Sequence, residues 1–141
     1  MIILPISLTI AGAAALVNFW LANRIGQVRR QEKISVGDGG NERLIRRMRA
    51  QANFVELTPF VLILIALIEL AVGTSTWLWI VGAVFIVGRI LHGIGMDGWA
   101  PGRLIGTIIA LLTLVGLAGY AIAIPYFSFN APVITEVPNG G

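Results

Sequence analysis

The sequence predicts an all-α integral membrane protein, a bundle of four transmembrane helices. Its 141 residues are 57% hydrophobic and only 12% charged, with a mean hydropathy of +0.87, whereas soluble domains carry about 25% charged residues. The apolar residues gather in long runs, and a helix needs about 20 such residues to cross a bilayer. The runs do not alternate between polar and apolar residues, as β-barrel strands do. This composition excludes a soluble enzyme, a disordered tail and, despite a pI of 10.2, a free nucleic-acid-binding module.

The four runs define the expected spans within a single domain that covers residues 1–141. We expect transmembrane helices at residues 2–22, 54–72, 77–96 and 104–124. The first run has no basic segment before it and no clear cleavage pattern after it, so we predict a retained helix rather than a signal peptide. The fourth run carries no charge.

Turn signals separate the runs. The glycine-rich segment 35–41 predicts a turn, and Asn41 is placed to cap a long second helix. The segment 95–102 (GMDGWAPG) separates the third helix from the fourth, with Pro101 near the start of the fourth. We expect the residues after Pro125 to form a short, extended tail.

Basic residues predict the orientation in the membrane. Eight of the ten lie between the first two runs: Arg24, Arg29, Arg30, Lys33, Arg43, Arg46, Arg47 and Arg49. The positive-inside rule therefore places this loop in the cytoplasm and both termini on the other side. We interpret Arg24, Arg30 and Arg43 as topology signals that extend toward lipid phosphates. The chain has no cysteine, which excludes disulfides and thiolate ligands, and we expect no metal site.

Charged residues inside the spans are the candidates for function, because they are costly there unless paired or hydrated. Helical spacing of +3 and +4 puts a set of polar residues on one face of the second helix. Further polar groups lie near the same membrane interface. The first set is Arg46, Arg49, Asn53 and Glu56, and the others are Arg29, Arg89, His92 and Arg103. Together they predict a hydrated, mostly cationic pocket that suits a small anionic ligand with one amino group.

Structural alternatives exist for several of these residues. Glu56 paired with Arg49 or Arg89 would simply hold the bundle together, and His92 would serve as a hydrogen-bond donor between helices. Glu69 lies near the far end of the second span, and we expect it to be structural. A small multidrug exporter is a further alternative, but those proteins carry a carboxylate deep in the first span, where this chain has none.

Residues 47–59, RMRAQANFVELTP, resemble the R-A-x-x-N-x-x-E signature of the MAPEG family, the membrane-associated proteins of eicosanoid and glutathione metabolism. The segment 26–29 (GQVR) is similar to the end of the first helix in that family, and the pair Arg89 and His92 is similar to its third-helix motif. Arg103 occupies the place of the family's fourth-helix arginine. The pattern, including GDGGNERLIRRMRAQANFVE at residues 37–56, looks most like the bacterial branch.

The resemblance implies a homotrimer in a bacterial inner membrane, with glutathione as cosubstrate bound between neighbouring subunits. Arg103 would stabilise the glutathione thiolate, which would attack a lipophilic small molecule in a transferase or peroxidase reaction. The residues implied to bind glutathione are Arg29, Arg49, Asn53, Glu56 and His92.

Four positions depart from the family's pattern. Two family tyrosines are replaced by Leu57 and Met96, and two polar residues of the family's prostaglandin E synthase are replaced by Ala52 and Leu104. These losses leave open an alternative function, a non-catalytic membrane protein that binds glutathione or another small anionic ligand.

Overall fold

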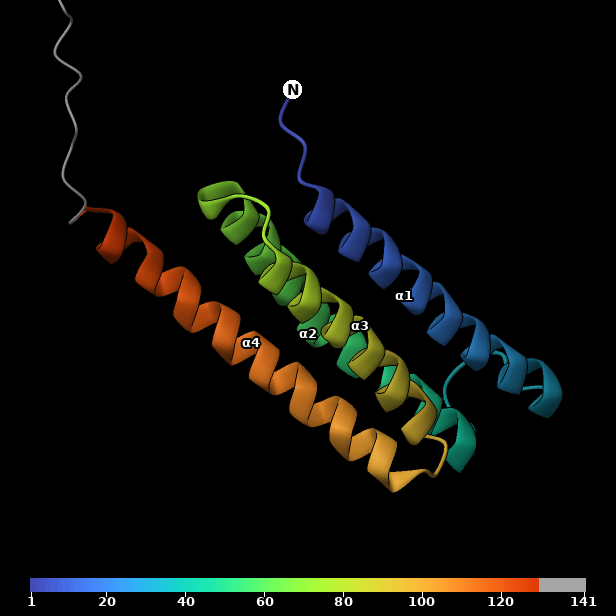
Figure 1. The fold of residues 1–141 in the computed structure, drawn as a ribbon. Coiled ribbons are helices and arrows are strands. Elements are labelled where there is room, and N and C mark those ends of the chain that lie inside the picture. The colour runs from blue at the N-terminus through green and yellow to red at the C-terminus, as the bar shows by residue number, and fades with distance from the viewer. Residues whose placement is uncertain (130–141) are drawn as a thin grey trace, which may run out of the picture.

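The computed structural model describes residues 1–129 as four helices in an up-and-down arrangement (Figure 1). The helices are α1 (Pro5–Glu32), α2 (Glu42–Val72), α3 (Thr76–Gly95) and α4 (Ala100–Phe129). All four are long and apolar enough to cross a membrane, so the predicted all-α membrane fold is confirmed. The α1–α2 loop and the α3–α4 turn lie at one end of the bundle, and the α2–α3 turn lies at the other (Figure 1).

The bundle is open on its long sides, since α1 and α4 pack on opposite sides of the central helices α2 and α3 (Figure 1). Within residues 1–129, α1 and α4 make no contact with each other. Most of α4 is exposed, including Leu112, Val115 and Ile122. Apolar side chains on the outer surface are normal for a helix that faces lipid or another protein chain.

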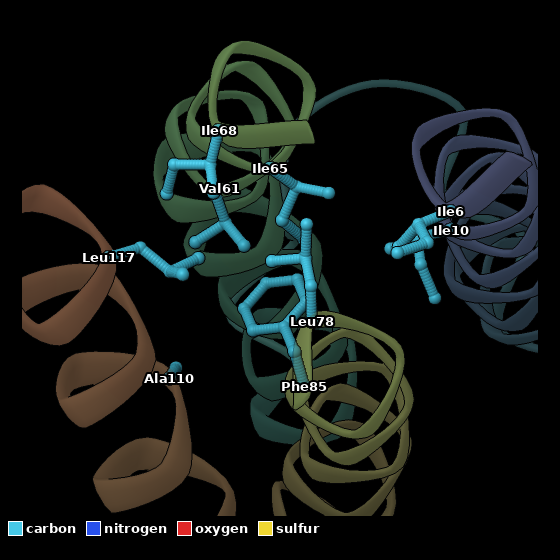
Figure 2. Packing of buried hydrophobic residues seen from close by; sticks show 9 residues of the cluster. All are labelled: Ile6, Ile10, Val61, Ile65, Ile68, Leu78, Phe85, Ala110 and Leu117. Carbon is cyan, nitrogen blue, oxygen red and sulfur yellow. The ribbon is translucent and has the colours of Figure 1, made fainter. Parts of the chain in front are cut away.

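Side chains from all four helices meet in the core at the half of the bundle nearer the α2–α3 turn (Figure 2). Isoleucine, valine and leucine dominate, and each residue of the cluster is at most 4% exposed. Figure 2 shows the nine residues: Ile6, Ile10, Val61, Ile65, Ile68, Leu78, Phe85, Ala110 and Leu117. Since lipid tails are as apolar as these side chains, close packing must supply much of the stability here.

The N-terminus of α1 is held by a side chain from α2. The N-cap residue Leu4 offers no capping side chain. Instead, the Glu69 carboxylate accepts hydrogen bonds from the N–H groups of Ile6 (3.0 Å) and Ser7 (2.8 Å) and from the Ser7 hydroxyl (2.6 Å). Thr74 donates a fourth hydrogen bond at 2.9 Å. Glu69 therefore has the structural role expected of it, as the cap of a neighbouring helix.

The start of α2 follows the prediction. Asn41 caps the helix by accepting a hydrogen bond from the Leu44 N–H at 3.0 Å. The preceding turn uses Gly37, Gly39 and Gly40 at φ values of 70°, 58° and 71°, which favour glycine.

Two helix ends differ from the prediction. Helix α1 continues past Ala22 to Glu32, and α4 continues through Pro125 to Phe129, so the extended tail predicted after Pro125 is wrong for residues 126–129. Proline interrupts one backbone hydrogen bond, but membrane helices tolerate it. The rest of the predicted tail, including Glu136, lies outside the described residues.

Candidate functional site

A polar cavity of about 280 Å³ lies between α2 and α3, toward the end of the bundle that carries the α1–α2 loop. Helix α2 contributes three of the predicted residues to its wall, and α3 contributes His92. The full lining is Arg49, Ala52, Asn53, Glu56, His92 and Met96. The structure thus brings together four of the residues implied to bind glutathione.

Arg103 lies in a second recess, which is next to this cavity. The recess measures about 540 Å³ and is lined by His92, Ala100, Pro101, Arg103, Leu104 and Thr107. His92 lines both spaces, so the two adjoin at this side chain. The close approach of α4 to His92 depends on Gly106, where a Cβ atom would lie 2.6 Å from the His92 Cβ and 2.5 Å from the Gly88 oxygen.

Three charged side chains at these two spaces are unpaired within residues 1–129. Arg49, Glu56 and Arg103 form no hydrogen bond or ion pair through their side chains in this part of the chain. The structural ion pair considered for Glu56 with Arg49 or Arg89 is therefore not formed. These side chains are free to bind a charged ligand.

Arg89 lies behind the cavity and is the most deeply buried cation, with 2% of its surface exposed. One guanidinium nitrogen (Nη1) donates to Asn53 Oδ1 at 2.7 Å, and the other (Nη2) donates to the Gly106 carbonyl at 2.7 Å. Its Nε has no hydrogen-bond partner in the described chain. Arg89 thus links α3 to both α2 and α4.

A second polar cluster joins α1, α2 and the α3–α4 turn. Asp97 accepts hydrogen bonds from the guanidinium groups of Arg24 and Arg47, with both Arg47 contacts at 3.2 Å. Arg24 also donates to the Gly93 carbonyl at 2.8 Å and lies over the Trp20 ring at 4.7 Å. Only 9% of Arg24 is exposed, so its interpretation as a mere topology signal is wrong.

Sequence analysis missed this cluster because its members are far apart along the chain. Asp97 is 73 residues from Arg24 and 50 from Arg47, and no periodic pattern connects positions on different helices. The available signal was Asp97 itself, an acidic residue between glycines at the end of a span.

Arg29 and Arg46 lie outside the cavity. Arg29 donates to the Gly37 carbonyl at 2.7 Å and so holds the α1–α2 loop, and it lines neither the cavity nor the recess. Arg46 pairs with Glu42 at 2.6 Å and lines a separate charged recess with Arg47 and Asp97. Within one chain, neither side chain joins Arg49, Asn53 and Glu56.

The polar groups of the cavity and the recess lie within a stretch that matches a known family. The sequence model of the MAPEG family matches residues 7–123, which include every residue of both spaces. The chain belongs to the MAPEG family. The four helices of the structure are consistent with the four-helix bundle of that family.

Among curated MAPEG relatives, the chain is similar to the inner membrane protein YecN of Escherichia coli strain K12. The two are 32% identical over 94 residues, which cover 63% of this chain and 71% of the relative. The YecN protein of E. coli O6:H1 strain CFT073 matches to the same extent.

Proposed function

We propose that the protein is a glutathione-dependent membrane enzyme of the transferase or peroxidase type. The observation that carries this proposal is a set of charges that are unpaired within residues 1–129 and lie around two adjoining spaces: Arg49 and Glu56 at the cavity, and Arg103 in the recess beside His92. Membership of the MAPEG family supports a glutathione-related function.

The donor set fits glutathione, which carries two carboxylates, one ammonium group and one thiol. Arg49 and Asn53 suit a carboxylate, Glu56 suits the ammonium group, and His92 lines the wall beside them. Arg29 suits the other carboxylate, but it does not reach the cavity of its own chain. We therefore propose a homotrimer in which glutathione binds between neighbours, so that Arg29 of one subunit serves the cavity of the next.

Arg103 would provide the main chemical effect. A free cysteine thiol has a pKa of about 8.5 and is mostly protonated at neutral pH, whereas the thiolate is the nucleophile. The Arg103 guanidinium group, which has no anionic partner within residues 1–129, would stabilise that thiolate. The sulfur would then bond to an electrophilic carbon of a lipophilic substrate that arrives from the bilayer, as the bond from that carbon to its leaving group breaks and the leaving group departs with the electron pair. With a peroxide, the sulfur would bond to one oxygen as the O–O bond breaks, and the other oxygen would take up a proton to give an alcohol. A second glutathione would then convert the resulting sulfenic acid to the disulfide and water.

We further propose that the protein resides in a bacterial inner membrane, the location that the name of the E. coli relatives states for them. The basic α1–α2 loop and the α3–α4 turn would face the cytoplasm, and both termini would lie on the opposite side.

Ultraviolet difference absorbance of the purified protein on addition of glutathione tests the proposal, because the thiolate absorbs where the thiol does not. We expect the wild type to show the thiolate band at neutral pH and the Arg103→Ala variant to lose at least about nine-tenths of it, in line with the tenfold or greater effect of a lost charged hydrogen bond. Arg30→Ala is the matched control, since Arg30 is exposed at the same end of the bundle. An unchanged band in Arg103→Ala would remove its assigned role.

A non-catalytic binding protein is the second candidate, and one observation favours it. Met96 and Ala52 line the cavity, so its wall offers a thioether and a methyl group at these positions instead of further hydrogen-bond donors. Calorimetric binding of glutathione without a thiolate band, and without conjugation of any electrophile tested, would support this function over catalysis.

A further inference from the structure

We propose that Arg89 is a positioning residue that fixes the orientation of the Asn53 side-chain amide and thereby adapts the cavity to a ligand carboxylate. This inference rests on the proposed function, because it concerns how the same cavity recognises glutathione. Arg89 itself does not line the cavity, whereas Asn53 does.

The orientation of Asn53 follows from hydrogen-bond chemistry. A guanidinium group only donates hydrogen bonds, whereas an asparagine amide has an oxygen that accepts and an NH2 group that donates. Arg89 Nη1 lies 2.7 Å from Asn53 Oδ1, so the amide oxygen is engaged on the Arg89 side. The NH2 group is therefore the part of Asn53 that remains for a ligand in the cavity.

Arg89 holds this orientation firmly because its own position is fixed. Its other terminal nitrogen (Nη2) donates to the Gly106 carbonyl at 2.7 Å, and the guanidinium carbon lies 6.0 Å from the centre of the Phe85 ring. The side chain is also buried. Reversing the Asn53 amide would set its NH2 against an N–H donor of Arg89 in a partly buried place, which disfavours the reversed state by about tenfold.

The charge of Arg89 favours the same ligand. Within residues 1–129 no carboxylate forms an ion pair with this buried guanidinium. A buried charge without a counter-ion is costly, and an anion nearby offsets part of that cost. The Asn53 NH2 group, Arg49 and the field of Arg89 therefore all favour a carboxylate over a neutral or cationic group.

Asn53→Asp gives a near-isosteric test of the donor. The new carboxylate would still accept a hydrogen bond from Arg89, but it would present an oxygen to the cavity instead of an NH2 group. We expect this variant to unfold thermally at no lower temperature than Asn53→Ala. Its affinity for glutathione, measured by titration calorimetry, should be about tenfold or more lower than that of the wild type. It should also be lower than the affinity of Asn53→Ala. Binding as tight as that of the wild type would overturn the proposal.

A double-mutant cycle separates positioning from general support of the fold. We expect Arg89→Met to weaken glutathione binding about tenfold in the wild-type background. In the Asn53→Ala background the same change should cause a several-fold smaller loss of glutathione affinity, because no amide remains to be oriented. Arg89→Lys, which keeps a charged donor, should restore part of the lost affinity. Equal losses from Arg89→Met in both backgrounds would overturn the positioning role.

The failure of each idea gives a different result. If the wild-type protein binds no glutathione, the proposed function fails. If the wild type binds glutathione but the Arg89→Met losses are equal in the two backgrounds, or Asn53→Asp binds normally, only the role of Arg89 fails. If Arg89→Met does not fold, the glutathione affinity of Asn53→Asp still tests whether the Asn53 amide presents its NH2 group to the ligand.

Discussion

Two glutamates of α2 have different roles, one structural and one available for ligand binding, because their surroundings differ. Glu69 is 2% exposed and accepts four hydrogen bonds. Three come from Ile6 and Ser7 at the start of α1, and one comes from Thr74 in the α2–α3 turn. Glu56 is exposed, lines the cavity and has no partner within the described chain. The first carboxylate is fully engaged in the fold, and the second is available.

Glu69→Ala should therefore destabilise the protein without weakening ligand binding at the far cavity. The N–H groups of Ile6 and Ser7 would lose their acceptor, and each unsatisfied buried donor costs about 1–3 kcal/mol. Thermal unfolding in detergent measures the effect, and Glu56→Ala is the matched control. We expect that control to unfold like the wild type but to bind glutathione more weakly. A reversal of these two results would contradict the assignment.

At the scale of the helices, the Asp97 cluster fixes the turn from which α4 starts. Arg24 of α1 and Arg47 of α2 both donate to this carboxylate, so one side chain ties two helices to the α3–α4 turn. Arg103 lies in the first turn of α4, only six residues after Asp97 in the sequence. The position of Arg103 thus depends on a group that takes no part in the proposed chemistry.

Asp97→Ala should cost more stability than the loss of a surface ion pair. The Asp97 side chain is 33% exposed, but its partners are only 11% and 10% exposed. We expect a loss between the ~1 kcal/mol of a surface pair and the ~3–5 kcal/mol of a fully buried one. Glu32→Ala, at an exposed position at the end of α1 whose side chain forms no hydrogen bond or ion pair within residues 1–129, is the control in a chemical unfolding series. Equal stability of the two variants would show that the cluster adds nothing.

The helices also show which features of the structure could be predicted from the sequence. The apolar runs predicted the four spans, and Asn41 with the glycines before it predicted the start of α2. These two features could be predicted because each depends on residues that are neighbours in the chain. Helical spacing likewise grouped Arg49, Asn53 and Glu56. The contacts of Arg24 with Asp97 and of Arg89 with Asn53 depend on how helices pack, and residues 73 and 36 positions apart leave no periodic signal.

At the scale of the whole molecule, the orientation in the membrane can be tested cleanly because the chain has no cysteine. We introduce single cysteines at the exposed residues Ser35, in the α1–α2 loop, and Thr76, after the α2–α3 turn. In intact cells, a membrane-impermeant thiol reagent should label Thr76→Cys from outside the inner membrane and leave Ser35→Cys unlabelled. The reverse pattern would invert the proposed topology.

The open arrangement of the helices bears on assembly. Since α1 and α4 do not touch within residues 1–129, each presents a long outer face. We expect native mass spectrometry from detergent to show three copies of the 15.1 kDa chain. A monomer that still binds and ionises glutathione would contradict the proposed sharing of Arg29 between subunits.

The cap on α1 also has a consequence for biosynthesis. The N–H of Ile6 finds its acceptor 63 residues later in the chain, at Glu69. At about 5–20 residues per second, a ribosome needs roughly 3–13 s to add that stretch. During this interval the first helix has exposed donors at one end, which lipid does not satisfy. We therefore expect the translocon to retain the first helix until the second has emerged, and to release the two into the bilayer as a pair.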